Sequence, residues 1–150
     1  MWQRIQTLFL VLAVIALLVS LVQPIWSMRD AEVPAYVLTP FYLAKGGAYQ
    51  YFPYSLAAIF SVAAITLAIT SISRFKNRVL QIKLGALNSL ILVGTVGCSV
   101  YFATQLIKEF EGGEYGMGLY LPVVAVFCNL VANFFIRRDE RLVRNSERLR

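Results

Sequence analysis

Two cysteines are the most reactive side chains within the apolar part of this sequence. Cys98 and Cys128 each stand alone, with no second cysteine beside them. Thiol chemistry that passes electrons to a quinone uses exposed, usually paired cysteines, because a thiolate must first meet a partner protein. The two residues lie at similar depth in their apolar stretches, so they could be neighbours. We interpret them as small apolar packing residues rather than as a redox pair.

Three asparagines are the other polar side chains of interest in the apolar stretches. Asn88 and Asn133 lie at similar depth, and Asn129 lies one helical turn from Asn133 on the same face. We predict that Asn88 and Asn133 meet across an antiparallel helix pair, as part of an amide ladder. Each such bond contributes about 0.6 kcal/mol and at most about 2 kcal/mol in a membrane. The alternative is that the three amides line a path for a small substrate.

Ionisable side chains are missing from the centres of the apolar stretches, and the chain has no histidine. Proton relays and coupled transport depend on buried carboxylates, and haem and many metal sites depend on histidine. We therefore predict no catalytic residue, no cofactor and no metal site, and a protein that is not an enzyme.

Four long apolar stretches must position these side chains, at about residues 7–26, 54–72, 84–107 and 119–136. Each is close to the roughly 20 residues that a helix needs to cross a bilayer, and a lipid-exposed backbone must bond within its own segment. Apolar residues make up 59% of the chain and charged residues 15%. The predicted fold is all-α, one domain of four transmembrane helices over residues 1–150.

Positive charge is distributed unevenly between the connecting segments. Of the 14 basic residues, all but Arg29, Lys45 and Lys108 fall on the side that holds both termini and the middle connection. The positive-inside rule therefore predicts that both termini are cytoplasmic. A net charge of +6 also occurs in nucleic-acid-binding proteins. Here the cations flank helix ends, where anionic lipid explains them, so no nucleic-acid partner is expected.

The outer connection at residues 27–53 is longer than the outer connection at residues 109–118. It contains prolines, the pair Gly46-Gly47 and an aromatic run at residues 49–52. The glycine pair predicts a short hairpin across the mouth of the bundle. We interpret the segment as a lid on the headgroups, with recognition of a ligand or partner as the alternative. Residues 109–118 are rich in glycine and are predicted to form a flexible turn.

The C-terminal segment at residues 137–150 is basic and contains no helix breaker. It is predicted to continue the fourth helix as a cytoplasmic tail that makes no contact on which the bundle depends. A basic helix of this kind either lies on anionic lipid or docks a protein.

Four segments resemble one protein family along the whole chain. They are residues 3–7 (QRIQT), 75–83 (FKNRVLQIK) with the following Leu87-Asn88, the pair Leu121-Pro122, and the tail at residues 137–150. Together they resemble an uncharacterised family of small bacterial four-span membrane proteins, domain of unknown function 4293. The resemblance implies a location in the bacterial inner membrane, and it brings no activity and no catalytic residue.

Two functional hypotheses follow. The first is a non-catalytic accessory or structural subunit that binds a partner protein or anionic lipid through its cytoplasmic basic residues. Those residues are Arg74, Lys76, Arg78, Lys83, Arg137, Arg138, Arg141, Arg144 and Arg148. The second is a small transporter or channel lined by Asn88, Asn129 and Asn133, which would need two or more copies because four spans enclose little space.

Overall fold

The computed structural model describes residues 2–28, 36–75 and 77–148, and the side chains of residues 5–28, 36–75 and 77–144. In this part of the chain there are four helices, α1 (Trp2–Val22), α2 (Leu56–Ser73), α3 (Arg78–Phe110) and α4 (Met117–Arg148). Five short strands lie between the helices. After α1 come β1 (Trp26–Met28), β2 (Tyr36–Leu38), β3 (Leu43–Lys45) and β4 (Ala48–Gln50), and after α3 comes β5 (Glu114–Tyr115).

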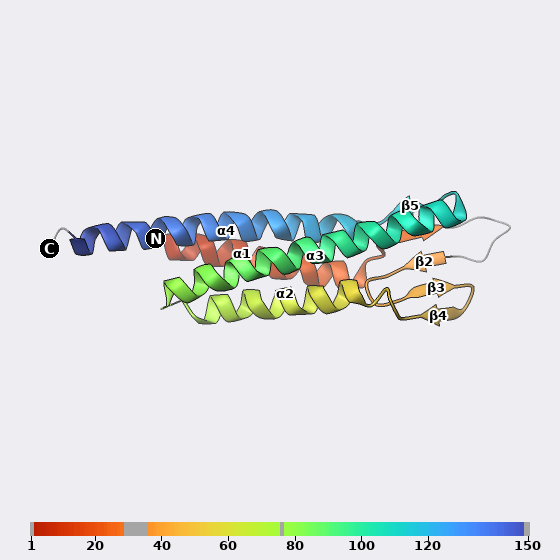
Figure 1. Ribbon diagram of the computed structural model, residues 1–150, viewed down its shortest axis with the longest axis horizontal. Coiled ribbons are helices and arrows are strands. Elements are labelled where there is room, and N and C mark those ends of the chain that lie inside the picture. The colour runs from red at the N-terminus through yellow and green to blue at the C-terminus, as the bar shows by residue number, and fades with distance from the viewer. Residues whose placement is uncertain (1, 29–35, 76, 149–150) are drawn as a thin grey trace.

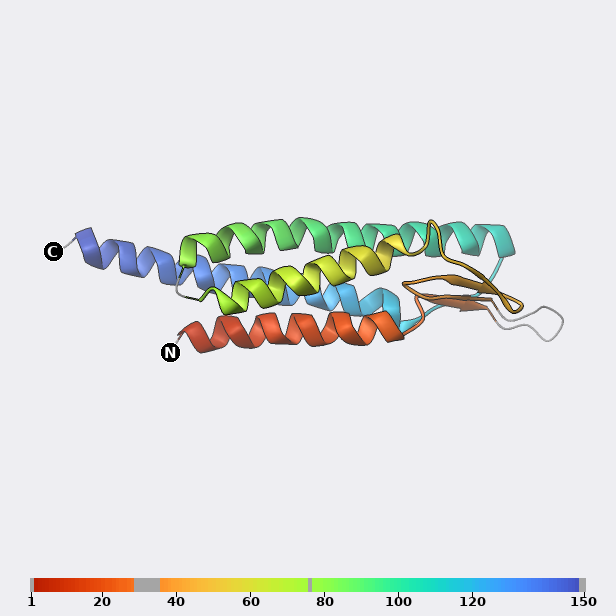
Figure 2. The same cartoon turned by 90° about the horizontal axis from the view of Figure 1, so that it is seen from below.

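The helices form an elongated bundle with different structures at its two ends. α1 contacts α2 and α4, and α3 contacts the same two helices. The strands lie at one end, which we call the sheet end (Figures 1 and 2). The start of α1, the α2–α3 connection and the C-terminal part of α4 lie at the other end, and α4 runs on past the other helices there. We call this the basic end, after the described cations Arg74, Arg78, Lys83, Arg137, Arg138, Arg141 and Arg144.

The exterior of the bundle is apolar. Each of the four helices contains a segment long and apolar enough to cross a membrane, which confirms the prediction of four apolar helices. Large apolar side chains cover the outside as well: Leu90 is 70% exposed and Phe127 is 64% exposed. A bundle in water would turn such side chains inward, whereas lipid solvates them. The surface is therefore that of a multi-pass membrane protein.

The inner face of α3 is small and polar. Its buried residues recur at helical spacing: Gln81, Gly85, Asn88, Leu92, Thr95, Ser99, Ala103 and Leu106. Hydroxyl groups on this face bond within their own helix, as when Ser99 Oγ donates to the Thr95 carbonyl at 2.9 Å. Helices in lipid gain little from burying apolar surface, so they associate through close contact of small residues and through hydrogen bonds. This inner face therefore holds α3 in the bundle.

The prediction of an all-α fold is confirmed for the four helices but misses an antiparallel sheet, which the two outer connections form in the order β4-β3-β2-β1-β5. The expected hairpin is confirmed, since β3 pairs with β4 around Gly46 and Gly47, which have φ of 53° and 99°. β5 lies in the segment predicted as a flexible turn, and it pairs with Trp26 and Ser27 of β1. Strands of two or three residues are too short to show an alternating pattern in the sequence.

α1 ends at Val22, before the first apolar stretch does. Pro24 follows, and proline cannot donate the amide bond that would continue the helix. The Ile25 amide instead donates to the Leu38 carbonyl at 2.8 Å, and the Ile25 carbonyl accepts from the Gly116 amide at 2.8 Å. Trp26 therefore belongs to the sheet and not to the first span, and Ile25 is joined to the sheet end by its backbone hydrogen bonds.

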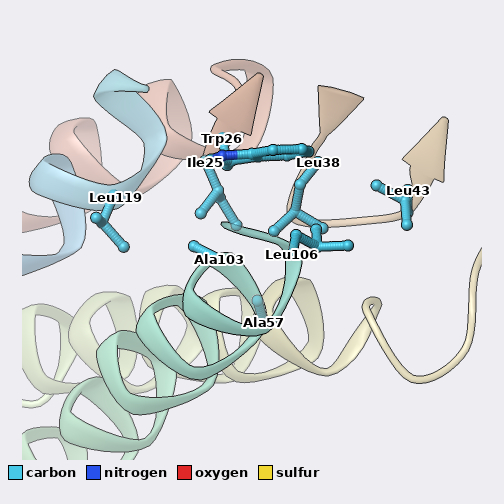
Figure 3. Packing of buried hydrophobic residues seen from close by; sticks show 8 residues of the cluster. All are labelled: Ile25, Trp26, Leu38, Leu43, Ala57, Ala103, Leu106 and Leu119. Carbon is cyan, nitrogen blue, oxygen red and sulfur yellow. The ribbon is translucent and has the colours of Figure 1, made fainter. Parts of the chain in front are cut away.

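The sheet packs on the last turns of α3, which extend beyond the other helices at the sheet end (Figures 1 and 2). Figure 3 shows Ile25, Trp26 and Leu38 gathered over Ala103 and Leu106 of α3. Trp26 is 0% exposed, and its ring stacks on Phe110 with centroids 6.1 Å apart. The cluster also contains Ala57 of α2 and Leu119 of α4, so it joins the outer connections to the ends of three helices.

Candidate functional site

The predicted asparagines form a polar layer between α3 and α4. Asn88 Nδ2 donates to Asn129 Oδ1 at 3.0 Å. Asn129 Nδ2 donates to Ser89 Oγ at 2.8 Å and to the Gly85 carbonyl at 3.2 Å. Asn129 is 0% exposed and Asn88 is 2% exposed. Asn129 thus lies at the centre of the layer, and the predicted amide ladder between these helices is confirmed.

The predicted pairing within the ladder is wrong by one helical turn. Asn88 bonds to Asn129, while Asn133 Nδ2 donates to Ser89 Oγ at 3.4 Å. The side chain of Asn133 lies over Gly85, where any Cβ would overlap it. The prediction counted depth from the ends of the apolar stretches, but α3 begins at Arg78 and α4 continues to Arg148. The axial offset of the two helices is therefore set by their contact at Gly85, and it brings Asn129 opposite Asn88.

Gly85 and Ser89 are two further members of the layer, and their spacing of four residues places them on one face of α3. Gln81 was not recognised. Its side chain is 1% exposed, and its Nε2 donates to the Ser71 carbonyl at 2.8 Å, which joins the start of α3 to the end of α2. A glutamine seven residues before Asn88 lies on the same helix face, and this spacing could have revealed it.

The polar layer has spare hydrogen-bond acceptors. Among the described residues, the side-chain oxygens of Gln81, Asn88 and Asn133 are buried without a donor. An amide oxygen can accept two hydrogen bonds, so these atoms could hold water or a ligand that donates protons. Amide and hydroxyl groups do not titrate near neutral pH. The layer is therefore suited to hydrogen bonding and not to proton transfer.

The cysteines are free thiols and both are partly buried. Cys128 packs against an apolar cluster in the middle of the bundle that includes Leu17, Ala64 and Leu92. This contact agrees with the interpretation of Cys128 as a packing residue. Within the described chain there is no group of three or more His, Cys, Asp or Glu side chains that could hold a metal ion.

An ion pair joins the C-terminal tail to the bundle at the basic end. Arg78 Nη2, in the first turn of α3, lies 3.2 Å from Asp139 Oδ2 of α4. The two side chains are 24% and 16% exposed, and the contact is an ion pair rather than an aligned hydrogen bond. The tail therefore contacts the bundle at its first turn, while the expectation that the bundle does not depend on the tail stays a prediction. The helical continuation of α4 is confirmed as far as Arg148.

The other predicted basic residues are not all brought together. Arg137, Arg138 and Arg141 line a hollow of about 510 Å³ with Phe134 and Leu142. Arg74 and Lys83 are exposed at the same end, as is Arg144, but none of them lines this hollow. Lys76 and the side chain of Arg148 lie outside the described residues. The hollow on α4 therefore brings together three of the predicted basic residues.

In a comparison with protein families, residues 2–149 match the family described as Domain of unknown function (DUF4293). A comparison with curated proteins finds no match. The matched region includes the helices, the outer sheet, the polar layer and the hollow described above. The chain therefore belongs to the DUF4293 family, as the resemblance of its four sequence segments suggested.

Proposed function

We propose that this chain is a non-catalytic integral membrane protein, an accessory or structural subunit that binds a partner protein or anionic lipid through its basic end. The observation that carries the proposal is the hollow on α4, where three arginines lie beside the apolar side chains of Phe134 and Leu142. Arginine forks bind carboxylate and phosphate groups in a planar, two-point geometry. Such a surface attracts acidic protein segments and anionic headgroups alike.

The shape of the basic end supports the proposal. α4 runs past the ends of the other three helices, so its last turns have no helix of the bundle beside them (Figures 1 and 2). The Arg78–Asp139 ion pair fixes the start of this projecting segment against α3. A projecting helix that is anchored at its base can present its arginines to a partner without disturbing the spans.

Purification from native membranes in mild detergent tests this proposal. We expect the wild-type chain to keep a partner protein or an anionic phospholipid at a constant molar ratio, measured by mass spectrometry of the intact complex. A variant with the three arginines of the hollow replaced by glutamine (Arg137, Arg138 and Arg141) should lose this bound partner or lipid by at least about tenfold, because each cation near an anionic surface contributes about 1 kcal/mol.

The matched control removes cations at the sheet end, with Lys45 and Lys108 replaced by glutamine. This variant should keep the bound partner protein or anionic lipid. A wild-type chain that emerges with neither a protein nor an anionic lipid at constant ratio would refute the proposal.

The second candidate function is a small oligomeric transporter or channel lined by Asn88, Asn129 and Asn133. The observation that favours it is the set of buried amide oxygens without a donor in the polar layer. In one chain these residues lie closed between α3 and α4, at 2%, 0% and 8% exposure. A path for substrate would therefore need a second copy to open or complete the layer. If the purification from native membranes yields a homo-oligomer with no other protein or anionic lipid bound at a constant ratio, this function is favoured over the first.

We propose further that the chain lies in a bacterial inner membrane with both termini in the cytoplasm. The charge distribution supports this orientation, because the basic end gathers most of the cations and the sheet end few. The opposite orientation would move the cations of the basic end across the membrane.

Cysteine labelling of intact cells tests the orientation, in a background without Cys98 and Cys128. Ala48→Cys introduces a thiol on the exposed strand β4, and Arg144→Cys introduces one on the exposed tail. An impermeant maleimide should label the first at least about tenfold more strongly than the second, as the positive-inside rule requires. The reverse ratio would overturn the orientation, and permeabilised cells, in which both should react, are the control.

A further inference from the structure

We propose that the hollow on α4 is a binding site for one anionic phospholipid, whose phosphate is held by Arg137 and Arg141. This inference rests on the proposed function and names the partner that the basic end takes. The inference rests on the order of side chains along one face of α4, on the depth of the arginines, and on a lining that contains no acid.

The lining residues lie on a single helix face. Phe134, Arg137, Arg138, Arg141 and Leu142 are spaced as i, i+3, i+4, i+7 and i+8, which is one stripe of an α-helix. Three of the five carry a guanidinium group, and none is acidic. A ligand in the hollow therefore meets concentrated positive charge on one side only.

The same stripe continues into the span as exposed apolar side chains. Phe127, Leu130 and Phe134 are spaced as i, i+3 and i+7, and they are 64%, 50% and 62% exposed. Arg137 and Arg141 come next on this face. On this face, exposed apolar side chains are followed by two arginines. In a phospholipid, the apolar acyl chains are followed by a charged phosphate in the same order. A soluble partner or a free anion would meet only the arginine part of this surface.

The depth of the arginines agrees with the position of a headgroup. From Met117 to Ile136, α4 has about 20 residues and so spans about 30 Å, the thickness of the hydrocarbon. Arg137 then lies at the edge of the hydrocarbon, and Arg141 lies about 6 Å further out, within the headgroup layer. Phe134 remains inside the hydrocarbon, at the level of the upper acyl chain.

Two acids, Asp139 and Glu140, lie among these arginines in the sequence, and neither of them lines the hollow. Asp139 lies between Arg137 and Arg141 in the sequence, but residues two apart on a helix do not face each other. Its carboxylate instead pairs with Arg78 on α3 at 3.2 Å. Because the Asp139 carboxylate is paired with Arg78, it does not compete with a phosphate for Arg137 and Arg141.

Native mass spectrometry of the full-length chain in nanodiscs tests the inference. The discs contain phosphatidylcholine with a minor fraction of phosphatidylglycerol, and the protein is released with its bound lipids at 0.15 M salt. The wild type should retain one phosphatidylglycerol against the excess of phosphatidylcholine. The variant R137Q/R141Q should bind phosphatidylglycerol about 30-fold more weakly, as expected from the loss of two cations at an anionic headgroup.

Three further variants separate this site from general charge attraction. R74Q/K83Q removes two exposed cations from the same end but outside the hollow, and it should stay within about twofold of the wild type. R137K/R141K keeps the charge but loses the planar fork, so its affinity should be intermediate. Phe134→Ala keeps every charge and should still weaken binding several-fold, because it removes the acyl-chain contact. If R137Q/R141Q fails to fold, the phosphatidylglycerol binding of R137K/R141K and of Phe134→Ala tests the inference instead.

Several results would overturn the inference. Equal loss in R74Q/K83Q would show that charge at the basic end acts without the hollow. Displacement of the lipid by millimolar inorganic phosphate would show that the site takes a free anion. Retention of a stoichiometric protein with no preference for phosphatidylglycerol would refute the lipid site and leave the proposed function standing, whereas retention of neither would refute both.

Discussion

Replacing Trp26 with alanine should lower the free energy of unfolding of the sheet end by about 3–5 kcal/mol, the cost of removing a large aromatic side chain from a packed cluster. Trp26 is 0% exposed, stacks on Phe110, and lies against the backbone turn at Gly113, where any Cβ would overlap its ring. Loss of this ring removes the main contact between β1 and α3. Hydrogen exchange of the β1 and β2 amides and proteolysis of the outer connections should both accelerate strongly.

Two control substitutions sharpen this result. Tyr49 lies on β4 of the same sheet and is 60% exposed, so Tyr49→Ala should cost less than about 1 kcal/mol. The indole Nε1 of Trp26 is buried without an acceptor among the described residues. Trp26→Phe therefore removes an unpaired donor together with some volume, and it should cost much less than the alanine variant. If Trp26→Ala left exchange at β1 and β2 unchanged, the sheet would not depend on its contact with α3.

Replacing Gly85 with leucine should destabilise the bundle by about 2–3 kcal/mol, because overpacking a close helix contact forces both helices to move. A side chain at position 85 would collide with the Asn133 amide, and the Gly85 carbonyl accepts a hydrogen bond from Asn129. Separation of α3 from α4 would therefore also weaken the amide ladder, at about 0.6 kcal/mol for each bond. Thermal or denaturant unfolding in mild detergent measures the effect.

The matched control is Gly97 on the same helix, because a Cβ there would meet no atom within 4 Å. Gly97→Leu changes helix propensity in the same direction and adds the same apolar surface, but it should leave the bundle as stable as the wild type or slightly more stable. Equal effects at the two positions would mean that the contact between Gly85 and Asn133 does not set the spacing of α3 and α4.

Much of this architecture follows from local sequence. The four apolar helices could be predicted because hydropathy over about 20 residues determines whether a segment can cross a bilayer. The continuation of α4 into the basic tail could be predicted because helix breakers act within one or two turns. Asn88, Asn129 and Asn133 could be assigned to a ladder because an amide in lipid needs a partner, whatever the partner is.

Apart from the hairpin of β3 and β4, the outer sheet could not be predicted in the same way. Its strands are two or three residues long, and β5 belongs to a different connection from its neighbour β1. Pairing between segments so far apart depends on where the ends of α1, α3 and α4 lie in space. The local sequence around Glu114 and Tyr115 therefore indicates a turn, while the contact with Trp26 and Ser27 makes it a strand.

The sequence alone determined which segments are helical and which side chains need polar partners, because both depend on the solvent and on a few neighbouring residues. Only the tertiary structure decided which groups are the partners of these polar side chains. The axial offset and rotation of α3 against α4 place Asn88 on Asn129, seat Asn133 over Gly85, and bring Arg78 to Asp139. The same rotation leaves Arg137 and Arg141 facing outward in a hollow. The pattern of side chains on a helix repeats every turn, so the sequence permits several axial offsets between α3 and α4. Close packing at one small residue, Gly85, selects one of them.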